Sequence, residues 1–214
     1  KFFNKIKFIN PKKNIEEKNN LSPIFVMGLP RSGTTLVESL ISSNKRKIDN
    51  YGETFIIPNV IKKILENNSD ELLLDISLIR SKVCKEYLKI SYNREMKSTL
   101  FVDKTLENIF FIDIIKEIFP LSKIIVCERD YFDSFVAIFQ QCLQGLSWAH
   151  KKSSILQYIQ NFHNFVKKIK KQKNKNIHFV DLIELTENPK LISRKIFEFC
   201  DLDWDASVLK FYER

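Results

Sequence analysis

The sequence predicts an α/β fold of three layers, in which a central parallel sheet lies between two layers of helices. Short continuous apolar runs, typical of strands buried on both faces, alternate along the chain with longer segments. In those segments apolar residues recur every three or four positions, which is typical of amphipathic helices. Near the start of the chain, an apolar run, a glycine-containing loop and a helical segment follow one another directly. Strands that alternate with helices in this way form parallel sheets covered by helices on both faces.

The expected elements follow in chain order. Residues 1–22 are polar and rich in Lys and Asn, so we expect a lead-in or linker, followed by one domain over residues 23–214. Residues 67–70 are expected to end the second helix and cap the third, and Asn188 with Pro189 to begin the last helix. Strands are predicted at 24–27, 100–102, 123–127 and 177–180. Helices are predicted from residue 34 onward, at 54–66, 70–92, 107–119, 130–143 and 155–169, and from residue 189 onward.

The composition excludes several classes of protein. The chain has 214 residues, of which 44% are hydrophobic and 29% charged, so it is neither disordered nor fibrous. Its formal charge is +9, but the basic residues are scattered, so we expect no nucleic-acid partner. The densest basic run, at 167–173, ends a predicted helix, where cations oppose the helix dipole. A patch that attracts acidic partners is the alternative for this run, and the excess charge also favours an anionic cofactor.

The cysteines and histidines predict neither disulfides nor a metal site. Cys84, Cys127, Cys142 and Cys200 lack C-x-x-C spacing and have apolar neighbours, so we expect buried free thiols. The histidines show neither an H-x-x-x-H nor an H-E-x-x-H pattern. Free thiols and the lack of an export signal favour the cytoplasm. The apolar runs are far shorter than the ~20 residues that span a bilayer, so we expect no membrane segment.

Residues 28–35 read Gly-Leu-Pro-Arg-Ser-Gly-Thr-Thr and have the G-x-x-x-x-G frame of a nucleotide phosphate-binding loop. Glycines let backbone amides approach phosphate oxygens, and the following helix directs its free N–H groups and its dipole at the anion. The Thr34 and Thr35 hydroxyls can also donate. Thr34 stands where the G-K-[ST] motif has Lys, so an ATPase or GTPase would lack its phosphate-bridging cation. The cation lies inside the loop instead, at Arg31.

An arginine inside the loop, followed by Ser-Gly-Thr-Thr, resembles the 5′-phosphosulfate loop of the sulfotransferases, which use 3′-phosphoadenosine 5′-phosphosulfate (PAPS). The resemblance implies a P-loop-type α/β/α fold and covers residues 23–209, nearly the whole chain. It is greatest to the tyrosylprotein sulfotransferases and to the bacterial sulfotransferases often fused to TPR repeats. Four later segments resemble the family in the expected order: Gly-Glu-Thr at 52–54, Asp-Lys-Thr-Leu-Glu-Asn at 103–108, the apolar run ending in Cys-Glu-Arg-Asp at 124–130, and 203–209.

The resemblance implies a role for each matching residue. Arg31 would stabilise the sulfonate and the leaving 5′-phosphate, which Ser32, Gly33, Thr34 and Thr35 would cradle. Glu53 would be the general base that takes the proton of the acceptor hydroxyl. Lys104 would neutralise charge on the bridging oxygen, and Arg129 would hold the 3′-phosphate. Transfer would then be in line, would need no metal, and would leave 3′,5′-adenosine bisphosphate (PAP).

The sequence departs from the family pattern at several positions. Ala137 stands where the family usually has a serine, with Ser134 one helical turn earlier as a weak substitute, and Leu106 replaces the proline of D-K-x-P. The chain begins at Lys1 rather than Met and ends at Arg214, before the C-terminal segment that closes over the cofactor in many relatives. We therefore expect a fragment that lacks this segment and has room upstream for an anchor or TPR repeats.

Several alternatives stay open. Glu53 is alternatively a carboxylate at a helix start, Lys104 a solvated lysine, and Arg129 a partner of Asp130 in a surface ion pair. For function, the alternatives are a non-catalytic relative that binds a nucleotide or a partner, and another P-loop transferase such as a small-molecule kinase. The acceptor is equally open between protein tyrosine, carbohydrate and small molecule, and a homodimer is compatible with the sequence.

Overall fold

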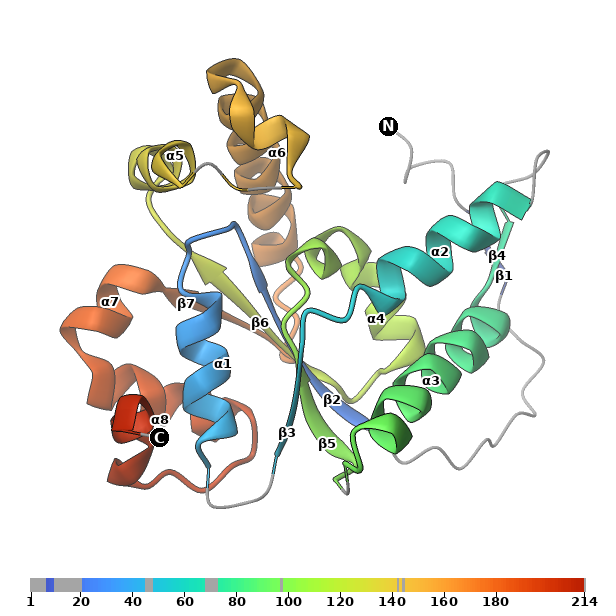
Figure 1. The fold of residues 1–214 in the computed structure, drawn as a ribbon, viewed down its shortest axis with the longest axis horizontal. Helices are drawn as coiled ribbons and strands as arrows, with labels where there is room; N and C mark the ends of the chain where they lie inside the picture. The colour runs from blue at the N-terminus through green and yellow to red at the C-terminus, as the bar shows by residue number, and fades with distance from the viewer. Residues whose placement is uncertain are drawn as a thin grey trace.

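The computed structural model of the chain describes residues 7–9, 21–44, 48–67, 73–96, 98–141, 143 and 145–213. A five-stranded sheet lies at the centre of the molecule, in the order β3-β5-β2-β6-β7, and each neighbouring pair of strands is parallel (Figure 1). The predicted parallel sheet is therefore confirmed. Its strands are β2 (Ser22–Gly28), β3 (Asp49–Gly52), β5 (Leu100–Asp103), β6 (Lys123–Glu128) and β7 (Ile177–Asp181).

Helices cover both faces of the sheet, which confirms the three-layer architecture. Helices α1 (Thr34–Ser42), α7 (Leu182–Glu187) and α8 (Pro189–Phe199) lie together at one side of the sheet in Figure 1. The other helices lie on the opposite side or beyond the strand ends: α2 (Ile56–Asn67), α3 (Ile76–Asn93), α4 (Ile112–Ile118), α5 (Tyr131–Gln140) and α6 (Lys152–Lys171). Short 3₁₀ helices complete the fold: η2 (Leu106–Phe111), η3 (Ser147–His150) and η4 (Ala206–Glu213).

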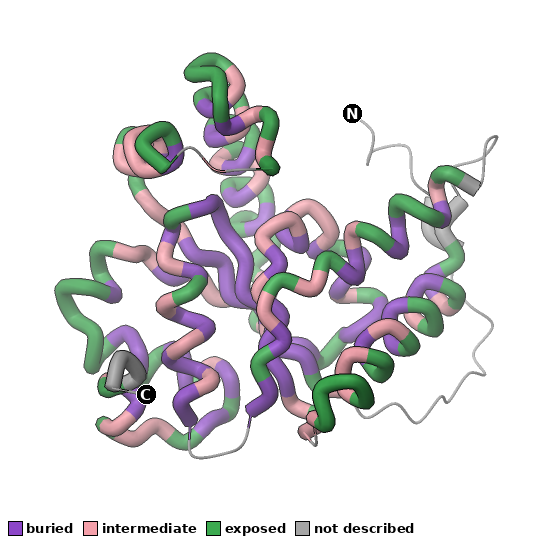
Figure 2. The backbone as a smooth tube through the Cα atoms, in the orientation of Figure 1, coloured by how far each residue is buried: buried purple, intermediate pink, exposed green. Residues whose placement is uncertain are grey.

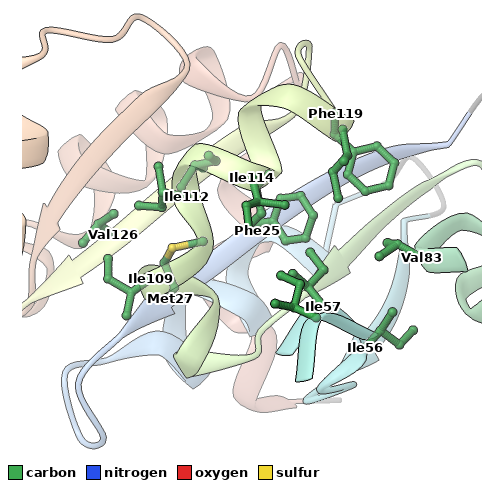
Figure 3. Packing of buried hydrophobic residues seen from close by; sticks show 14 of the residues in the cluster. Phe25, Met27, Ile56, Ile57, Val83, Ile109, Ile112, Ile114, Phe119 and Val126 are labelled. Atoms are coloured by element: carbon green, nitrogen blue, oxygen red, sulfur yellow. The ribbon is translucent and has the colours of Figure 1, made fainter. Parts of the chain in front are cut away.

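Two apolar clusters hold the layers together, one on each face of the sheet. Successive residues of a strand point to opposite faces, so neighbours on β2 enter different clusters. Phe25 and Met27 pack in the cluster drawn in part in Figure 3, which includes residues of α2, α3, α4 and α6. Ile24 and Val26 pack instead with residues of α1 and α8. The central strands are buried along their length, as Figure 2 shows. Burial on both faces explains why these strands read as continuous apolar runs.

The third helix begins later than predicted. Residues 73–75, expected to be helical, form strand β4 (Leu73–Asp75), which pairs in parallel with β1 (Lys7–Ile9), inside the expected lead-in. Helix α3 starts at Ile76, because the Asp75 carboxylate accepts hydrogen bonds from the N–H groups of Ser77 and Leu78. Residues 68–70 of the expected stop and cap lie outside the described residues, as do residues 1–6 and 10–20.

Other differences concern segments without strong apolar periodicity. The sequence analysis did not predict strand β3, whose residues form no apolar run, or the short helix α7. The predicted helix over 107–119 consists of 3₁₀ helix η2 followed by α4, and α5 ends at Gln140, before residue 143. Asn188 is the N-cap residue of α8 and Pro189 is in its first turn, as predicted, although the Asn188 side chain makes no capping hydrogen bond.

The thiol predictions are confirmed where the structure describes them. Cys84, Cys127 and Cys200 are buried, Cys127 and Cys200 as free thiols, while Cys142 lies outside the described residues. Burial raises the pKa of the Cys200 thiol to about 12, so this thiol is protonated at neutral pH. Within the described ranges, none of the helices combines the length and the apolar character needed to cross a bilayer.

Candidate active site

A cleft of about 720 Å³ lies at the carboxyl ends of the strands, where the loops after β2, β3, β5 and β6 meet. Open parallel sheets commonly bind ligands at this edge, and the volume lies within the usual range for small-molecule sites. The cleft brings together most of the residues that the resemblance singles out. It is lined by Pro30, Arg31, Gly33, Thr34, Thr35, Glu53, Phe55, Lys104, Leu106, Glu107, Arg129, Leu143, Gly145, Leu146 and Leu182.

The loop after β2 is shaped by its two glycines. A Cβ on Gly28 would lie 2.6 Å from the carbonyl oxygen of Cys127, so only glycine allows this close approach of β2 and β6. Gly33 has φ +89° and immediately precedes α1, and a Cβ there would lie 2.7 Å from a methyl carbon of Leu182. Since Gly33 has no side chain to cap the helix, the N-terminal amides of α1 are left to face the cleft.

Two arginines are associated with the loop after β2: Arg31 lies inside it, and Arg129 contacts it. Arg31 has φ 67°, in the left-handed region, and its exposed side chain belongs to the lining of the cleft. Arg129 follows β6, and its Nη1 donates a hydrogen bond of 3.0 Å to the carbonyl oxygen of Arg31. The carboxylate of Asp130 caps α5 by accepting from the N–H groups of Phe132 and Asp133. Arg129 therefore contacts the loop, whereas Asp130 serves the helix.

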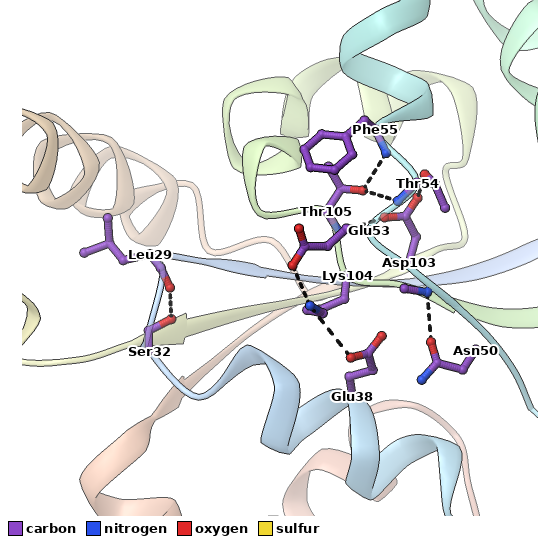
Figure 4. Close-up of polar contacts among 11 residues, drawn as sticks. Leu29, Ser32, Glu38, Asn50, Glu53, Thr54, Phe55, Asp103, Lys104 and Thr105 are labelled. Atoms are coloured by element: carbon purple, nitrogen blue, oxygen red, sulfur yellow. Dashed lines mark hydrogen bonds and ion pairs between the residues drawn. The ribbon is translucent and has the colours of Figure 1, made fainter. Parts of the chain in front are cut away.

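The other loop residues do not all reach the cleft. Thr34 and Thr35 are part of its lining, Thr34 being only 5% exposed. Ser32 is 1% exposed, and its hydroxyl and its N–H both donate to the carbonyl oxygen of Leu29 (Figure 4). The structure thus brings Thr34 and Thr35 to the site, but it directs the Ser32 side chain into the loop itself.

Lys104 and Glu53 form an ion pair in the cleft. The Lys104 Nζ lies 2.6 Å from Oε1 of Glu53, with the lysine side chain 12% exposed and the glutamate side chain 40% exposed (Figure 4). The two residues come from loops that are also tied through the backbone, since the N–H of Lys104 donates to the carbonyl oxygen of Gly52. The alternative of a solvated Lys104 is therefore wrong.

Asp103, which precedes Lys104, organises both loops from beneath the site. Its fully buried carboxylate accepts hydrogen bonds from four groups: the Tyr87 hydroxyl (2.7 Å), the Thr54 hydroxyl (2.6 Å), the Thr105 N–H (2.8 Å) and the Asn108 amide (3.3 Å). Burial, reinforced by the charge of Asp103, raises the pKa of Tyr87 well above its usual value, so the phenol donates as a neutral group. An acid at the end of an otherwise apolar strand is the sequence signal for this hub.

Thr105 completes the connection between the two loops. Its Oγ1 accepts hydrogen bonds from the N–H groups of Thr54 (3.0 Å) and Phe55 (3.1 Å), as Figure 4 shows. The loop that carries Glu53 is therefore held by two residues. Asp103 accepts a hydrogen bond from the side chain of Thr54, and Thr105 accepts hydrogen bonds from the backbone of Thr54 and Phe55. Such fixed hydrogen bonds hold a reactive group in one orientation before a substrate arrives.

Two further carboxylates near the site were missed by the sequence analysis. Glu107 lines the cleft, and burial together with the charge of Glu53 raises its pKa. Glu38, on α1, is 6% exposed, and its Oε2 lies 4.0 Å from the Lys104 Nζ. Burial raises the pKa of Glu38, an effect that Lys104 and the side chain of Asn50 partly oppose. Glu38 lies one turn into the helix that follows the loop, where an acid among apolar residues was the available signal.

The positions that depart from the family pattern differ in where they lie. Leu106 lines the cleft beside Lys104. Ala137 is half-buried on α5, outside the cleft lining. Ser134 is buried, and its hydroxyl contacts the carbonyl oxygen of Arg129 at 3.4 Å. Its hydroxyl is therefore directed at the backbone, which makes it a poor substitute for the missing serine. Within the part of the chain that the structure describes, no three His, Cys, Asp or Glu side chains are grouped to hold a metal ion.

Comparisons with known proteins agree with this geometry. The model of a family described as the sulfotransferase family matches residues 23–206. An uncharacterised protein of Aquifex aeolicus (strain VF5) is 30% identical over 206 residues, which cover 89% of this chain and 27% of that protein. This chain thus spans about a quarter of the length of that relative.

Several solved structures of similar fold are sulfotransferases. The sulfotransferase domain of the Synechococcus PCC 7002 olefin synthase superposes with a TM-score of 0.62 at 17% identity, over 94% of this chain and 81% of that chain. The mouse sulfotransferase SULT7A1, solved in complex with PAP, superposes with a TM-score of 0.58 at 18% identity, over 90% of this chain and 64% of that chain.

Proposed function

Because this chain belongs to the sulfotransferase family, we propose that it transfers a sulfonate group from PAPS to a hydroxyl group of an acceptor, leaving PAP. The observation that carries the proposal is that one cleft contains Arg31 and Arg129 beside the phosphate-binding loop and the Lys104–Glu53 ion pair opposite. Cations and helix amides suit a multiply charged nucleotide, and a carboxylate suits proton removal. We also propose residues 23–214 as the domain that performs this reaction.

The residues around the loop fit the donor. The N-terminal amides of α1, uncapped at Gly33, would hold the 5′-phosphate together with Thr34 and Thr35. Arg129, beside the loop at the tip of β6, would hold the 3′-phosphate that distinguishes PAPS from ordinary adenine nucleotides. The mouse relative solved with PAP supports a nucleotide of this kind. Ser32 would contribute only by shaping the loop.

The remaining residues fit the chemistry. When bound, PAPS supplies an activated sulfonate, whose bond to the 5′-phosphate oxygen breaks as sulfur bonds to the acceptor oxygen. Glu53 would take the proton of the acceptor hydroxyl, a contribution of typically ~10²–10⁴-fold in rate. Arg31 and Lys104 would neutralise the charge that builds on the leaving phosphate. Because Oε1 of Glu53 is paired with Lys104 in the resting site, an acceptor hydroxyl that binds this oxygen would loosen the ion pair.

The proposal predicts a preference for PAP and a separable role for Glu53. Calorimetric titration should show PAP binding at least ~10-fold more tightly than AMP, because AMP lacks the 3′-phosphate. The Glu53→Ala variant should lose ~10²–10⁴-fold in sulfonate transfer, measured from labelled PAPS to a panel of phenols, sugars and peptides, with PAP affinity almost unchanged. Arg129→Ala should remove the preference for PAP over AMP.

Three outcomes would contradict the proposal in different ways. Turnover of ATP with Mg²⁺, without PAP binding, would favour a P-loop kinase. PAP binding without transfer to any acceptor would favour a non-catalytic nucleotide-binding relative. A joint loss of PAP binding and transfer in Glu53→Ala would make Glu53 a structural residue.

A further inference from the structure

Glu38 is a buried acid whose position no part of the proposed reaction explains. It lies on α1, one turn beyond the phosphate-binding loop, with its side chain 8% exposed and its Oε1 lacking a hydrogen-bond partner among the described residues. A carboxylate buried in this way is costly unless a cation offsets its charge. Lys104 supplies that cation, with its Nζ 4.0 Å from Oε2 of Glu38 (Figure 4).

The same ammonium therefore lies between two carboxylates of different exposure. Glu53, at 2.6 Å, is 40% exposed at the cleft surface, whereas Glu38 is beneath it on the opposite side of Lys104 (Figure 4). An acceptor hydroxyl can reach only the exposed carboxylate. Once Glu53 binds the acceptor and becomes protonated, its attraction for the ammonium weakens, and Glu38 is the acid that still faces Lys104.

From this geometry we infer that Glu38 is a positioning residue for Lys104. Its buried carboxylate anchors the ammonium at the floor of the cleft, so that Lys104 keeps its place when the acceptor separates it from Glu53. The inference rests on the proposed function for its catalytic consequence, but the Glu38–Lys104 contact itself exists in the resting protein.

The charged groups around Glu38 determine how this anchor responds to pH. Burial raises the pKa of Glu38, the charges of Glu53 and Asp103 raise it further, and Lys104 and the Asn50 side chain lower it. Because its pKa is raised, Glu38 loses its negative charge at a higher pH than an ordinary glutamate does when the solution is acidified. The acid limb of the rate profile should then report the loss of the anchor.

The kinetic test compares Glu38→Gln with a matched control, Glu66→Gln, which removes an exposed acid on α2 that pairs with Lys62 at 3.8 Å. We expect Glu38→Gln to lower kcat by about 10- to 100-fold through misplacement of Lys104, with the KM for PAPS and the affinity for PAP changed less than ~3-fold. The acid limb of kcat should move to lower pH. Glu38→Asp, which keeps the charge, should recover part of the loss, and Glu66→Gln should match the wild type.

The second test needs neither cofactor nor activity. Urea unfolding of Glu38→Gln, Lys104→Met and the double variant forms a double-mutant cycle. If the two side chains act on each other, the double variant should lose less stability than the sum of the two single losses. If Glu38→Gln does not fold, the same cycle is measured with Glu38→Met, which removes the charge and keeps a side chain of similar volume.

The outcomes separate this inference from the proposed function. A wild-type protein without sulfonate transfer contradicts the function, while a non-additive cycle still supports the contact. If the wild type transfers sulfonate and Glu38→Gln has the same kcat as Glu66→Gln, the inference is overturned and the proposed function is not. A lower kcat with an unmoved acid limb and additive stability losses also overturns it, because Glu38 would then be only structural.

Discussion

At the scale of single residues, the site contains acidic side chains that lie close together but differ in burial and in contacts. Asp103 is fully buried and accepts four hydrogen bonds, Glu53 is the exposed acid of the cleft, and Glu38 is buried behind Lys104. Their environments differ in solvent access, and burial is what raises the pKa of Glu38. Chemically identical side chains thus obtain separate roles from where the fold places them.

Asp103→Asn is expected to be destabilising although it conserves shape. The amide oxygen can accept only part of the hydrogen bonds, and the amide N–H groups would face the donors of Tyr87 and Thr54 or of Thr105 and Asn108. We expect a loss of about 2–3 kcal/mol in the free energy of unfolding, measured by urea denaturation. Asp113→Asn, at an exposed acid of α4, is the matched control and should change stability by less than ~0.5 kcal/mol. Equal stabilities of the two variants would show that the Asp103 hub contributes little.

At the scale of elements, the site is assembled where loops leave the parallel strands. The loop between β2 and α1 has two left-handed positions, at Arg31 (φ 67°) and Gly33 (φ 89°), and these turn the backbone so that α1 starts at the cleft. The loops after β3 and β5 are joined by the Lys104 N–H to Gly52 bond and by Thr105. The geometry of the site therefore depends on pairs of loops rather than on any one of them.

Gly33→Ala is expected to perturb the start of α1 more than its backbone conformation alone predicts. Alanine is strained at φ +89°, and its Cβ would also meet Leu182 at 2.7 Å, so we expect a loss of about 2 kcal/mol or more in the free energy of unfolding. Gly145→Ala is the control, because Gly145 has a similar φ of +82° with no atom within 4 Å of a new Cβ, and should cost only about 1 kcal/mol. Equal losses in urea denaturation would show that α7 and the loop adjust freely.

At the scale of the whole molecule, one sheet separates two apolar clusters. Neighbouring residues of the same strand belong to opposite clusters, as Ile124 and Ile125 do on β6, and both are fully buried. A sheet covered on one face only would bury one of the two and expose the other. The three-layer architecture therefore predicts that substitution of either of two adjacent strand residues lowers the free energy of unfolding.

Ile124→Ala and Ile125→Ala should consequently be destabilising to a similar degree. Each substitution leaves a cavity in a different cluster, and we expect each to lower the free energy of unfolding by about 2–5 kcal/mol in urea denaturation. Ile183→Ala, at a position 43% exposed on α7, should cost less than ~1 kcal/mol. A small effect at either Ile124 or Ile125 would contradict burial of the sheet on both faces.

Local sequence was sufficient to predict the strands β2, β5, β6 and β7 and the helices with a clear apolar stripe, because burial on one or two faces leaves a period in the chain. It was insufficient for β3, whose residues 49–52 become a strand by pairing with β5, and for α3, whose start depends on the carboxylate of Asp75. Pairing and capping are specific contacts, and they leave no period for a sequence to show.

The candidate site divides in the same way. The sequence motifs predicted that Arg31, Glu53, Lys104 and Arg129 belong to one site. In the structure all four line the same cleft. That Asp103 joins two loops and that Glu38 approaches Lys104 from α1 followed only from the order of the strands in the sheet. The physical reason is that residue type and spacing encode burial and charge along the chain, whereas contacts between side chains distant in sequence exist only after the sheet has set the strands side by side.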